Sequence, residues 1–428
     1  MDIYRQKATD PAAAVSRVKS GERIYLGGGA GVPQVLVKAL VERADSLKDV
    51  EITHMLHFGE APYVEAKYAK SFRHNAVFIG ANVRKSVQEG RSDFTPVFLG
   101  EIPYLFKHNV LPLDYAFVQL SPPDEHGFCS FGAEVGCTKP AAESAKYVIA
   151  EINQRTPRTL GDSFMHVRDI DVIVETDYPL PEAPQGGGTP AHAKIGQIIA
   201  ERIPNGATLQ MGIGSIPDAV LKNLGSHRDL GIHTEMFSDG VVDLIEAGIV
   251  NGAKKTLHPG KVVVGFLFGT QRLYNFVSDN PIIEMHPTEY VNDPFIIAQN
   301  DYMYSINSAL EVDLTGQVAA DSVGTSFYSG VGGQMDFVRG ASRSKGGKPI
   351  IALPATAKGG EISRIVATLK TGTGITTTRS DGATIVTEYG AADLFGKTIR
   401  QRAQMLINIA APQFREELTK QAKELHYL

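Results

Sequence analysis

The sequence predicts an α/β fold made of two tandem, duplicated open α/β domains, with mostly parallel sheets flanked by helices. Three observations predict it: strands and helices alternate along the chain, the pattern restarts after the middle, and the composition is that of an ordinary globular protein. Hydrophobic residues make up 43% and charged residues 21% of the 428, so the chain can bury a core and global disorder is excluded. At about 100–200 residues per domain, the length predicts two to four domains.

The first half opens with a strand, a turn, a helix and a second strand. The strand is expected at 23–28 (RIYLGG), the glycine-rich turn at 27–31, the helix at 33–44 and the next strand at 50–56. Pro33 stands near the first turn of that helix, where proline is tolerated. This order is typical of a parallel sheet. A helix is expected at 11–20, and further strands at 75–80, 115–120, 147–152 and 171–176.

A proline- and glycine-rich stretch, 178–192, separates the two halves. It holds four prolines and three consecutive glycines, which favours a linker. We therefore expect one domain at 1–185 and a second at 186–428. In the second half, helices are expected at 193–203, at 217–224 and over the last 30 or so residues, and strands at 207–211, 230–236, 261–268, 350–355, 374–379 and 384–389.

The restart after the linker is a repeat. Residues 20–40 read SGERIYLGGGAGVPQVLVKAL, and residues 205–224 read NGATLQMGIGSIPDAVLKNL. With one single-residue gap, the glycines, the proline and the helix ending K-x-L match, and the strands that follow match as well. Any two strand–turn–helix units share some features, but this order of matched features favours duplication. The period is far too long for a solenoid.

Charge and cysteine content exclude several classes of protein. The net charge is only −5, which offers no case for nucleic-acid or anionic-membrane binding. The start of the chain has no apolar segment behind a basic one, and no apolar run approaches the ~18 residues of a membrane span. Cys129 and Cys137 are too few for a disulfide framework and are expected to be buried. His54, His57 and His126 lack helix-face metal spacing, so we expect no metal. The two cysteines and the missing apolar segments together suit a cytoplasmic protein.

Glu235 is the first candidate for chemistry. It lies at or near the end of the predicted strand in LGIHTEMFSDG, and the corresponding first-half segment has no acid there. Ligands of open α/β sheets bind outside the carboxyl ends of strands, where such a carboxylate can act as base or nucleophile. An ordinary half-exposed glutamate is the alternative.

Three glycine-containing segments are candidate ligand contacts. The turn GIGSI, 212–216, precedes a helix whose N-terminal N–H groups could hold a phosphate, although Pro217 makes the G-x-G-x-x-G match incomplete. Gly332 and Gly333, in SGVGGQMDFVRGA, can present two N–H groups to a developing oxyanion. Lys358, followed by two glycines, could meet phosphate. The alternatives are a tight turn, a surface loop and a solvated lysine, respectively.

The segments LQMGIGSIPDAV, GIHTEMFSDGVVDL, SGVGGQMDFVRGA and TEYGAADLFGKT stand in this order along the chain, and SPPDEHGFCSFG precedes them. Together they resemble the acetyl-CoA hydrolase/transferase family of class I CoA-transferases. The nearest likeness is to 4-hydroxybutyrate and butyrate:acetate CoA-transferases, over about residues 3 to 425. Each glycine motif is weak alone, but the ordered set is specific. The resemblance implies two tandem α/β domains of CoA-transferase type.

The resemblance also implies roles for single residues. The family's catalytic glutamate falls on Glu235. The CoA site would be lined by Gly212, Ile213, Gly214, Ser215 and Ile216, by Gly333 and Lys358, and more weakly by Leu310. Coenzyme A, as an acyl-CoA, would be a substrate together with a short-chain carboxylate such as acetate, butyrate or 4-hydroxybutyrate.

The implied mechanism is ping-pong. Ionised Glu235 attacks the thioester of an acyl-CoA, and a mixed anhydride and then a Glu235–CoA thioester form before a second carboxylate reverses the steps. The N–H groups of Gly332 and Gly333 would form the oxyanion hole. Two alternatives remain: an acyl-CoA hydrolase, in which water replaces the second carboxylate, and a non-catalytic acyl-CoA-binding protein. A homo-oligomer, dimer or tetramer, is expected because most soluble oligomers are symmetric.

Overall fold

The computed structural model describes residues 2–183 and 187–428 and divides the chain into two compact units. Unit 1 comprises Met1–Pro184, Glu235–Asp239 and Val263–Val291, and unit 2 comprises Gln185–Thr234, Gly240–Val262 and Asn292–Leu428. The domain boundary expected at 185/186 falls on residues outside the described ranges. Within those ranges, no helix combines the length and the apolar character that crossing a membrane requires.

A parallel sheet forms the centre of unit 1. Among the described residues it has seven strands in the order β4-β3-β2-β1-β5-β7-β9, and every pairing recorded between them is parallel. The strands are β1 (Arg23–Leu26), β2 (Val50–His54), β3 (Phe72–Ala76), β4 (Ser92–Phe94), β5 (Tyr115–Leu120), β7 (Tyr147–Asn153) and β9 (Val172–Thr176).

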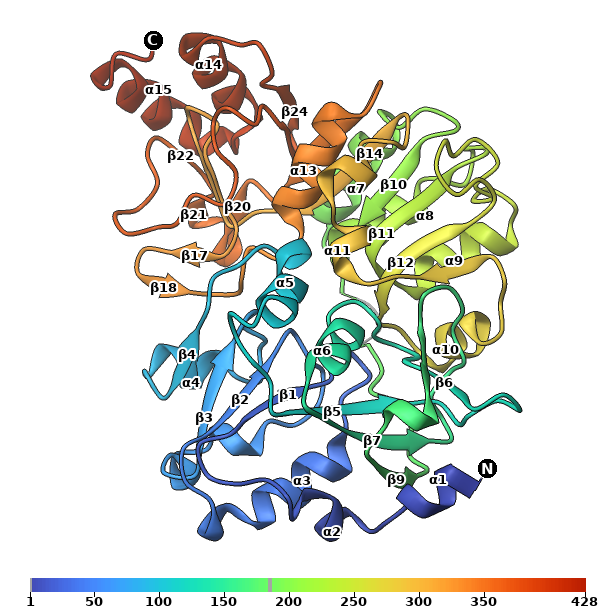
Figure 1. The fold of residues 1–428 in the computed structure, drawn as a ribbon. Helices are drawn as coiled ribbons and strands as arrows, with labels where there is room; N and C mark the ends of the chain where they lie inside the picture. Colours follow the sequence, from blue (N-terminus) through green and yellow to red (C-terminus); the bar gives the residue numbers. More distant parts are fainter. Residues whose placement is uncertain (1, 184–186) are drawn as a thin grey trace. The chain divides into compact units, whose positions relative to one another are not determined.

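Helices cover both faces of this sheet (Figure 1). Ile24 and Leu26 of β1 pack with apolar residues of α2 (Pro11–Val15) and α3 (Gln34–Glu42) in one core. Tyr25, between them, packs on the opposite face with α5 (Ile102–Lys107) and α6 (Thr138–Ser144). This alternation is what a strand buried on both faces requires. The shorter elements are α1 (Asp2–Lys7), α4 (Arg84–Gln88), β6 (Phe128–Ser130) and β8 (Phe164–His166).

A second, mostly parallel sheet follows in the chain. Its order among the described residues is β13-β12-β11-β10-β14-β19-β23-β24, and β24 is antiparallel to β23. The strands are β10 (Thr208–Met211), β11 (Gly231–Phe237), β12 (Val262–Leu267), β13 (Ile283–Met285), β14 (Met303–Ser308), β19 (Lys348–Ala352), β23 (Thr384–Thr387) and β24 (Gly390–Asp393).

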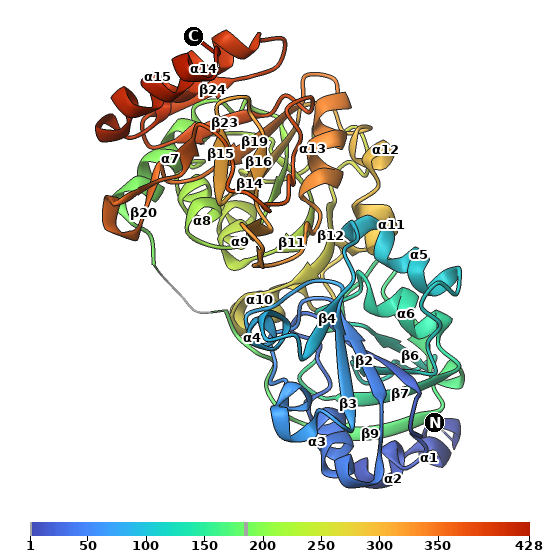
Figure 2. The ribbon, with the colours of Figure 1, turned by 90° about the vertical axis from the view of Figure 1, so that its left-hand side faces the viewer.

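The helices of unit 2 pack closely on one another and on this sheet. A Cβ added to Gly196 of α7 (Pro190–Ala200) would lie 2.5 Å from the carbonyl carbon of Ala219 in α8 (Ser215–Lys222), so only glycine permits this approach. Figure 2 shows α14 (Ile399–Ile409) beside β24. The remaining helices of the second half are α9 (Asp239–Glu246), α10 (Gln271–Val277), α11 (Thr288–Val291), α12 (Pro294–Ile297), α13 (Gln334–Arg343) and α15 (Arg415–Glu424).

Short strands make up the rest of unit 2. They form a three-stranded sheet and two hairpins among the described residues. They are β15 (Glu311–Asp313), β16 (Val318–Ala319), β17 (Ser322–Val323), β18 (Ser326–Phe327), β20 (Thr356–Ala357), β21 (Ile362–Ser363) and β22 (Ile365–Val366).

The strand order repeats between the two sheets. β1 pairs in parallel with β2 and β5, and β10 pairs in parallel with β11 and β14. Each of these central strands is the fourth in its sheet. The seven strands from β13 to β23 succeed one another in the same relative chain order as the seven strands of the first sheet. The predicted α/β fold with duplicated, mostly parallel sheets is confirmed.

Some expected elements differ from the structure. The strand expected at 75–80 lies earlier, at Phe72–Ala76. The strand expected at 374–379 is wrong: only Thr377 makes an isolated bridge, with Val318. The Thr376 hydroxyl instead donates to the distant carboxylate of Asp321. The sequence also gave no signal for β14, whose six residues include polar Ser305 and Asn307.

Candidate active site

Unit 2 contains a cavity of about 760 Å³, within the range of about 300–1,000 Å³ typical of small-molecule sites. Lining residues lie at or within two residues of the carboxyl ends of four parallel strands, β10, β14, β19 and β23, which is where open α/β sheets bind ligands. Five of the eight residues expected at the CoA site line it: Ile213, Ser215, Ile216, Leu310 and Lys358. Other lining residues are Thr189, Ala191, His192, Pro217, Ser308, Ala309, Tyr328, Ala352, Pro354, Thr356, Ala357, Gly359, Gly360, Arg364, Glu388, Tyr389 and Gln413.

The GIGSI turn carries the chain from β10 into α8. Gly214 is the N-cap of that helix, with φ 112° and ψ −176°, a conformation essentially confined to glycine. A Cβ on Gly214 or Gly212 would meet no atom within 4 Å, so the backbone angle rather than space requires glycine at 214. The cap brings no side-chain hydrogen bond, which leaves the N–H groups at the start of α8 suited to an anion. Gly212 and Gly214 themselves are not among the lining residues.

Two cations line the cavity. Lys358 has φ 49°, uncommon outside glycine, and Gly359 and Gly360 follow with positive φ and no atom near their added Cβ positions. Arg364 comes from the segment that follows the β20–β21 hairpin. Within 2–183 and 187–428, neither Lys358 nor Arg364 takes part in a recorded ion pair. Glu388 is the carboxylate of the lining, and it accepts a hydrogen bond from Ala355 N at 2.8 Å.

Leu310 lies in the short turn between β14 and β15. Its N–H donates to Ala319 O at 2.8 Å, which fixes the turn against β16. Ser308, Ala309 and Leu310 all line the cavity, so this turn supplies a continuous part of the wall.

Gly332 and Gly333 stand at the start of α13. Gly332 has φ 61°, and Gly333 is the N-cap, without a side-chain hydrogen bond. Phe337 N donates to Gly333 O at 3.1 Å, which begins the helix. Neither glycine lines the cavity of unit 2. Their placement directly before a helix is nevertheless one in which backbone N–H groups are not used by the helix itself.

Glu235 lies on β11, two residues before the strand ends at Phe237. It is half-buried, between buried Thr234 and half-buried Met236. A Cβ on Gly265 of β12 would lie 3.1 Å from the carbonyl oxygen of Glu235, a tight contact that would require the two strands to shift by a few tenths of an ångström. Burial raises the pKa of the Cys137 thiol in the same unit, and the charges of Glu134 and then Glu235 raise it further. The Glu235 carboxylate therefore acts electrostatically on a buried part of unit 1.

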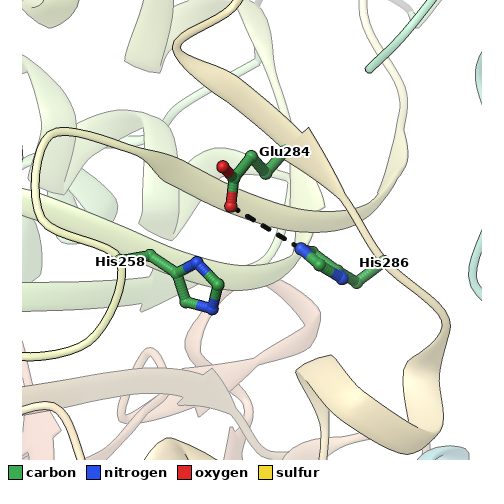
Figure 3. Close-up of side chains that lie close together, drawn as sticks. All are labelled: His258, Glu284 and His286. Carbon is green, nitrogen blue, oxygen red and sulfur yellow. Dashed lines mark ion pairs between the residues drawn. The ribbon is translucent and has the colours of Figure 1, made fainter. Parts of the chain in front are cut away.

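The cysteines and two of the histidines lie outside the cavity lining. Cys129 and Cys137 are free and buried, as expected. Glu284 and His286 of unit 1 form an ion pair, with 3.7 Å between Oε2 and Nε2 (Figure 3). His258, also drawn there, belongs to unit 2.

Several lining residues could not be identified from the sequence. Arg364 gave no signal because it stands in an ordinary-looking segment, EISRIV, and reaches the cavity only through the hairpin that follows Lys358. Glu388 and Tyr389 belong to TEYG, a segment quoted for the resemblance without a role. The repeat could have located the end of β14, because β5 occupies the equivalent place in the first sheet.

Known proteins resemble the chain along nearly its whole length. A 4-hydroxybutyrate coenzyme A transferase of Clostridium kluyveri is 51% identical over 99% of each chain. A butyryl-CoA:acetate CoA-transferase of Anaerostipes caccae is 38% identical over 98% of this chain and 97% of its own. The solved 4-hydroxybutyrate CoA-transferase of Porphyromonas gingivalis is 42% identical, with a TM-score of 0.86 over 99% of each chain.

Two family descriptions account for most of the chain. Residues 2–181 match the acetyl-CoA hydrolase/transferase N-terminal domain. Residues 269–422 match the acetyl-CoA hydrolase/transferase C-terminal domain. With these matches, and with full-length relatives well above 30% identity, the chain belongs to the acetyl-CoA hydrolase/transferase family.

Proposed function

We propose that the protein is a CoA-transferase that moves coenzyme A between a short-chain acyl-CoA and a free carboxylate, with Glu235 as the nucleophile. The observation that carries the proposal is the cavity of unit 2, where five predicted residues from three separate segments come together with a second cation, Arg364. The names of the full-length relatives favour 4-hydroxybutyryl-CoA, butyryl-CoA and acetyl-CoA as donors, with the matching acids as acceptors.

The chemistry of coenzyme A suits this cavity. Coenzyme A carries several phosphate charges on a long, partly apolar arm. Lys358 and Arg364 supply cations that no recorded ion pair within the described residues neutralises, and the start of α8 supplies N–H groups. Ile213, Ile216 and Leu310 supply apolar wall. Binding energy gained here, away from the reacting carbon, can position and strain the thioester.

The reaction proceeds in two matched halves. The Glu235 carboxylate attacks the thioester carbonyl of the donor, CoA thiolate leaves, and an acyl-glutamyl anhydride forms. The thiolate attacks the glutamyl carbonyl of that anhydride, which gives a Glu235–CoA thioester and releases the first carboxylate. The acceptor carboxylate then attacks this thioester and expels the thiolate. The thiolate finally attacks the acceptor's acyl carbonyl, which yields the new acyl-CoA and regenerates the Glu235 carboxylate.

Gly332 and Gly333 are proposed as donors to the oxyanion of these steps. A carboxylate is a weak nucleophile, so the reaction depends on N–H groups aimed at the developing charge and on the exclusion of water. The position of both glycines directly before α13 supports this role.

We also propose a cytoplasmic homo-oligomer, a dimer or tetramer, with domains at 1–185 and 186–428. The two buried, free cysteines suit a reducing compartment. Symmetric homo-oligomers are the commonest assemblies of soluble proteins. Light scattering on the purified protein measures the mass directly, and a monomer would contradict the assembly.

Acyl exchange tests the function. The purified protein is incubated with butyryl-CoA, with and without acetate, and the CoA pool is separated by chromatography. Acetyl-CoA that appears only with acetate, with little free CoA, is the expected result. Free CoA that accumulates regardless of acetate would instead identify a hydrolase. Tight binding of every acyl-CoA tried, without turnover, would identify a binding protein.

A further inference from the structure

Glu134 is a buried carboxylate of unit 1 to which no role has been given. Its side chain is 1% exposed. One carboxylate oxygen accepts from Cys137 N at 2.8 Å, and the other accepts from Thr138 N at 3.1 Å and from the Thr138 hydroxyl. The same hydroxyl accepts from Gly28 N at 3.1 Å. Glu134 therefore joins the start of α6 to the glycine-rich turn that follows β1.

The glycine-rich turn is shaped around this side chain. A Cβ on Gly29 would lie 3.2 Å from Cγ of Glu134, and one on Gly28 would lie 3.4 Å from its carboxylate. The turn is also bonded to the segment after β2, because Gly29 N donates to Leu56 O and Phe58 N donates to Gly29 O. The carboxylate thus sits at the centre of a closely packed region of unit 1.

The segment that carries Glu134 is bonded to the strand next to Glu235. Val135 N and Gly136 N both donate to Gly265 O, at 3.2 and 3.0 Å, and Leu267 N donates to Ala133 O at 2.8 Å. Glu134 itself bridges Phe266 in antiparallel fashion. Gly265 is the residue whose added Cβ would meet the backbone of Glu235. A continuous path of hydrogen bonds and close contacts therefore links the Glu134 carboxylate to the backbone of Glu235.

We infer that Glu134 is a positioning residue for the Glu235 nucleophile, holding residues 133–137 against β12 so that the backbone of Glu235 stays fixed. This inference rests on the proposed function of Glu235. Glu134 acts through Gly265 and takes no part in bond making. When the carboxylate oxygens of Glu134 no longer accept these hydrogen bonds, residues 133–137 can move relative to β12. The carboxylate of Glu235 is then no longer held in one geometry for attack.

The inference predicts a selective loss. The cavity with Lys358 and Arg364 belongs to unit 2 and is built from other residues, so ground-state binding of acyl-CoA does not depend on Glu134. A small misplacement of an attacking atom costs orders of magnitude in rate. A change at Glu134 should therefore lower kcat and leave KM for acyl-CoA unchanged.

Glu151 offers a matched control in the same unit. It is also fully buried, and it accepts from a helix start, Leu36 N, at 2.6 Å. The Tyr178 hydroxyl also donates to it, and the backbone of Val35 is a further hydrogen-bond partner. No recorded hydrogen bond joins Glu151 to β12. A general effect of neutralising a buried carboxylate in unit 1 would appear equally in both variants.

The experiment compares Glu134→Gln with Glu151→Gln by steady-state acyl exchange and by the rate at which the Glu235–CoA thioester forms, followed by mass spectrometry. Glu134→Gln should lower kcat and the rate of adduct formation about tenfold or more, with KM for acyl-CoA within about twofold of wild type. Glu151→Gln should keep kcat within about threefold. Thr138→Val, which keeps the carboxylate and removes the hydroxyl link to Gly28, should lower kcat about threefold and serves if Glu134→Gln does not fold.

Three results would overturn the inference: a Glu134→Gln variant with wild-type kcat, equal kcat losses in the two glutamine variants, or a loss confined to KM. If Glu134→Gln does not fold, a Thr138→Val variant with wild-type kcat would overturn the inference instead. The wild-type protein, run alongside, separates this failure from that of the proposed function. A wild type that exchanges no acyl group, or that forms its adduct at another residue, would refute the role of Glu235 itself.

Discussion

The two copies of the strand–turn–helix motif share a backbone arrangement but differ in what lies against the turn. In the first copy, the turn at 27–31 is buried, and added Cβ atoms on Gly28 and Gly29 would meet the side chain of Glu134. In the second copy, added Cβ atoms on Gly212 and Gly214 would meet nothing within 4 Å, and Ile213 lines a cavity. One turn is filled by the protein's own carboxylate, and the other is left open.

The helix that follows each turn shows the same contrast. At the start of α3, Gln34 N donates to the Tyr178 hydroxyl at 3.1 Å and Leu36 N donates to the Glu151 carboxylate at 2.6 Å. At the start of α8, the N-cap Gly214 brings no side-chain acceptor, and Ser215 and Ile216 face the cavity. Because helix starts need acceptors, the comparison teaches that internal carboxylates in one copy occupy the role that an anionic ligand can take in the other.

The largest effect is expected at Glu235, the acid that the second copy has and the first lacks. Glu235→Ala should lower acyl exchange by about a thousandfold or more, because the covalent step is lost. Glu235→Asp should lose about a hundredfold, because a shorter side chain withdraws the attacking oxygen by about 1 Å. Circular dichroism on both variants controls for folding. A Glu235→Ala enzyme with a tenth of the wild-type rate would end the assignment, and so would a borohydride-trapped label on another peptide.

The second test concerns the internal carboxylate behind α3. Burial raises the pKa of the Glu151 carboxyl to about 7. Between the unfolded and folded pKa values, the unfolded chain binds fewer protons than the native protein, so this group's contribution to stability falls as the pH rises from about 4.5 to 7. The glutamine of the Glu151→Gln variant does not titrate. The free energy of unfolding of this variant, relative to that of wild type, should therefore rise by about 3 kcal/mol as the pH increases from about 4.5 to 7.

Urea unfolding at several pH values measures this difference. Glu42→Gln, at an exposed position on α3, is measured alongside as a surface control. A difference between Glu151→Gln and wild type that stays flat across this pH range would mean that the Glu151 carboxylate stays ionised and well paired throughout.

The third test addresses the open copy. Lys358→Ala and Arg364→Ala should each raise KM for acyl-CoA about tenfold, with little change in kcat, because each removes one charge-assisted contact to phosphate. The KM of wild type should also rise with salt, and less so in the double variant. Lys420→Ala, an exposed lysine of unit 2 that does not line the cavity, should leave KM unchanged. Unchanged KM in the Lys358 and Arg364 variants would place the ligand's phosphates elsewhere.

The smallest effect sharpens the comparison at one glycine. Gly214→Ala should cost on the order of 1 kcal/mol in stability and raise KM severalfold, because alanine is strained at φ 112°. Gly212→Ala, with equal open space and no positive φ, should be tolerated in both respects. Thermal unfolding and steady-state kinetics on the pair measure this. Equal behaviour of the two variants would show that the backbone angle at 214 does not matter for the site.

The duplicated fold could be predicted because it depends on local signals. The match of glycines, proline and K-x-L between 20–40 and 205–224 anticipated the repeated strand order of the two sheets. Glu235 could be placed near a strand end from its neighbours alone, and β11 does end two residues after it. Hydrophobic periodicity carries this kind of information well.

What the sequence could not reveal depends on long-range contacts. Arg364 reaches the cavity through a hairpin of two-residue strands, too short for any periodicity. Glu134 reads as an exposed acid in GAEVGC. Its donors on Cys137 and Thr138 are local, but only the fold packs its side chain against the distant turn of Gly28 and Gly29. β14 lies inside the sheet between β10 and β19, but polar Ser305 and Asn307 interrupt its apolar residues, so no hydrophobic run marks it in the sequence.

The exposed backbone at Lys358 offers a direct way to measure ligand binding in the cavity. Trypsin cleaves after lysine in exposed backbone, and Lys358 and Gly359 are both exposed at the rim of the cavity. A ligand seated against Lys358 would shield that peptide bond. The rate at which trypsin cuts after Lys358, with and without each candidate acyl-CoA, would then rank ligands by affinity without any turnover, even in a protein whose nucleophile has been removed.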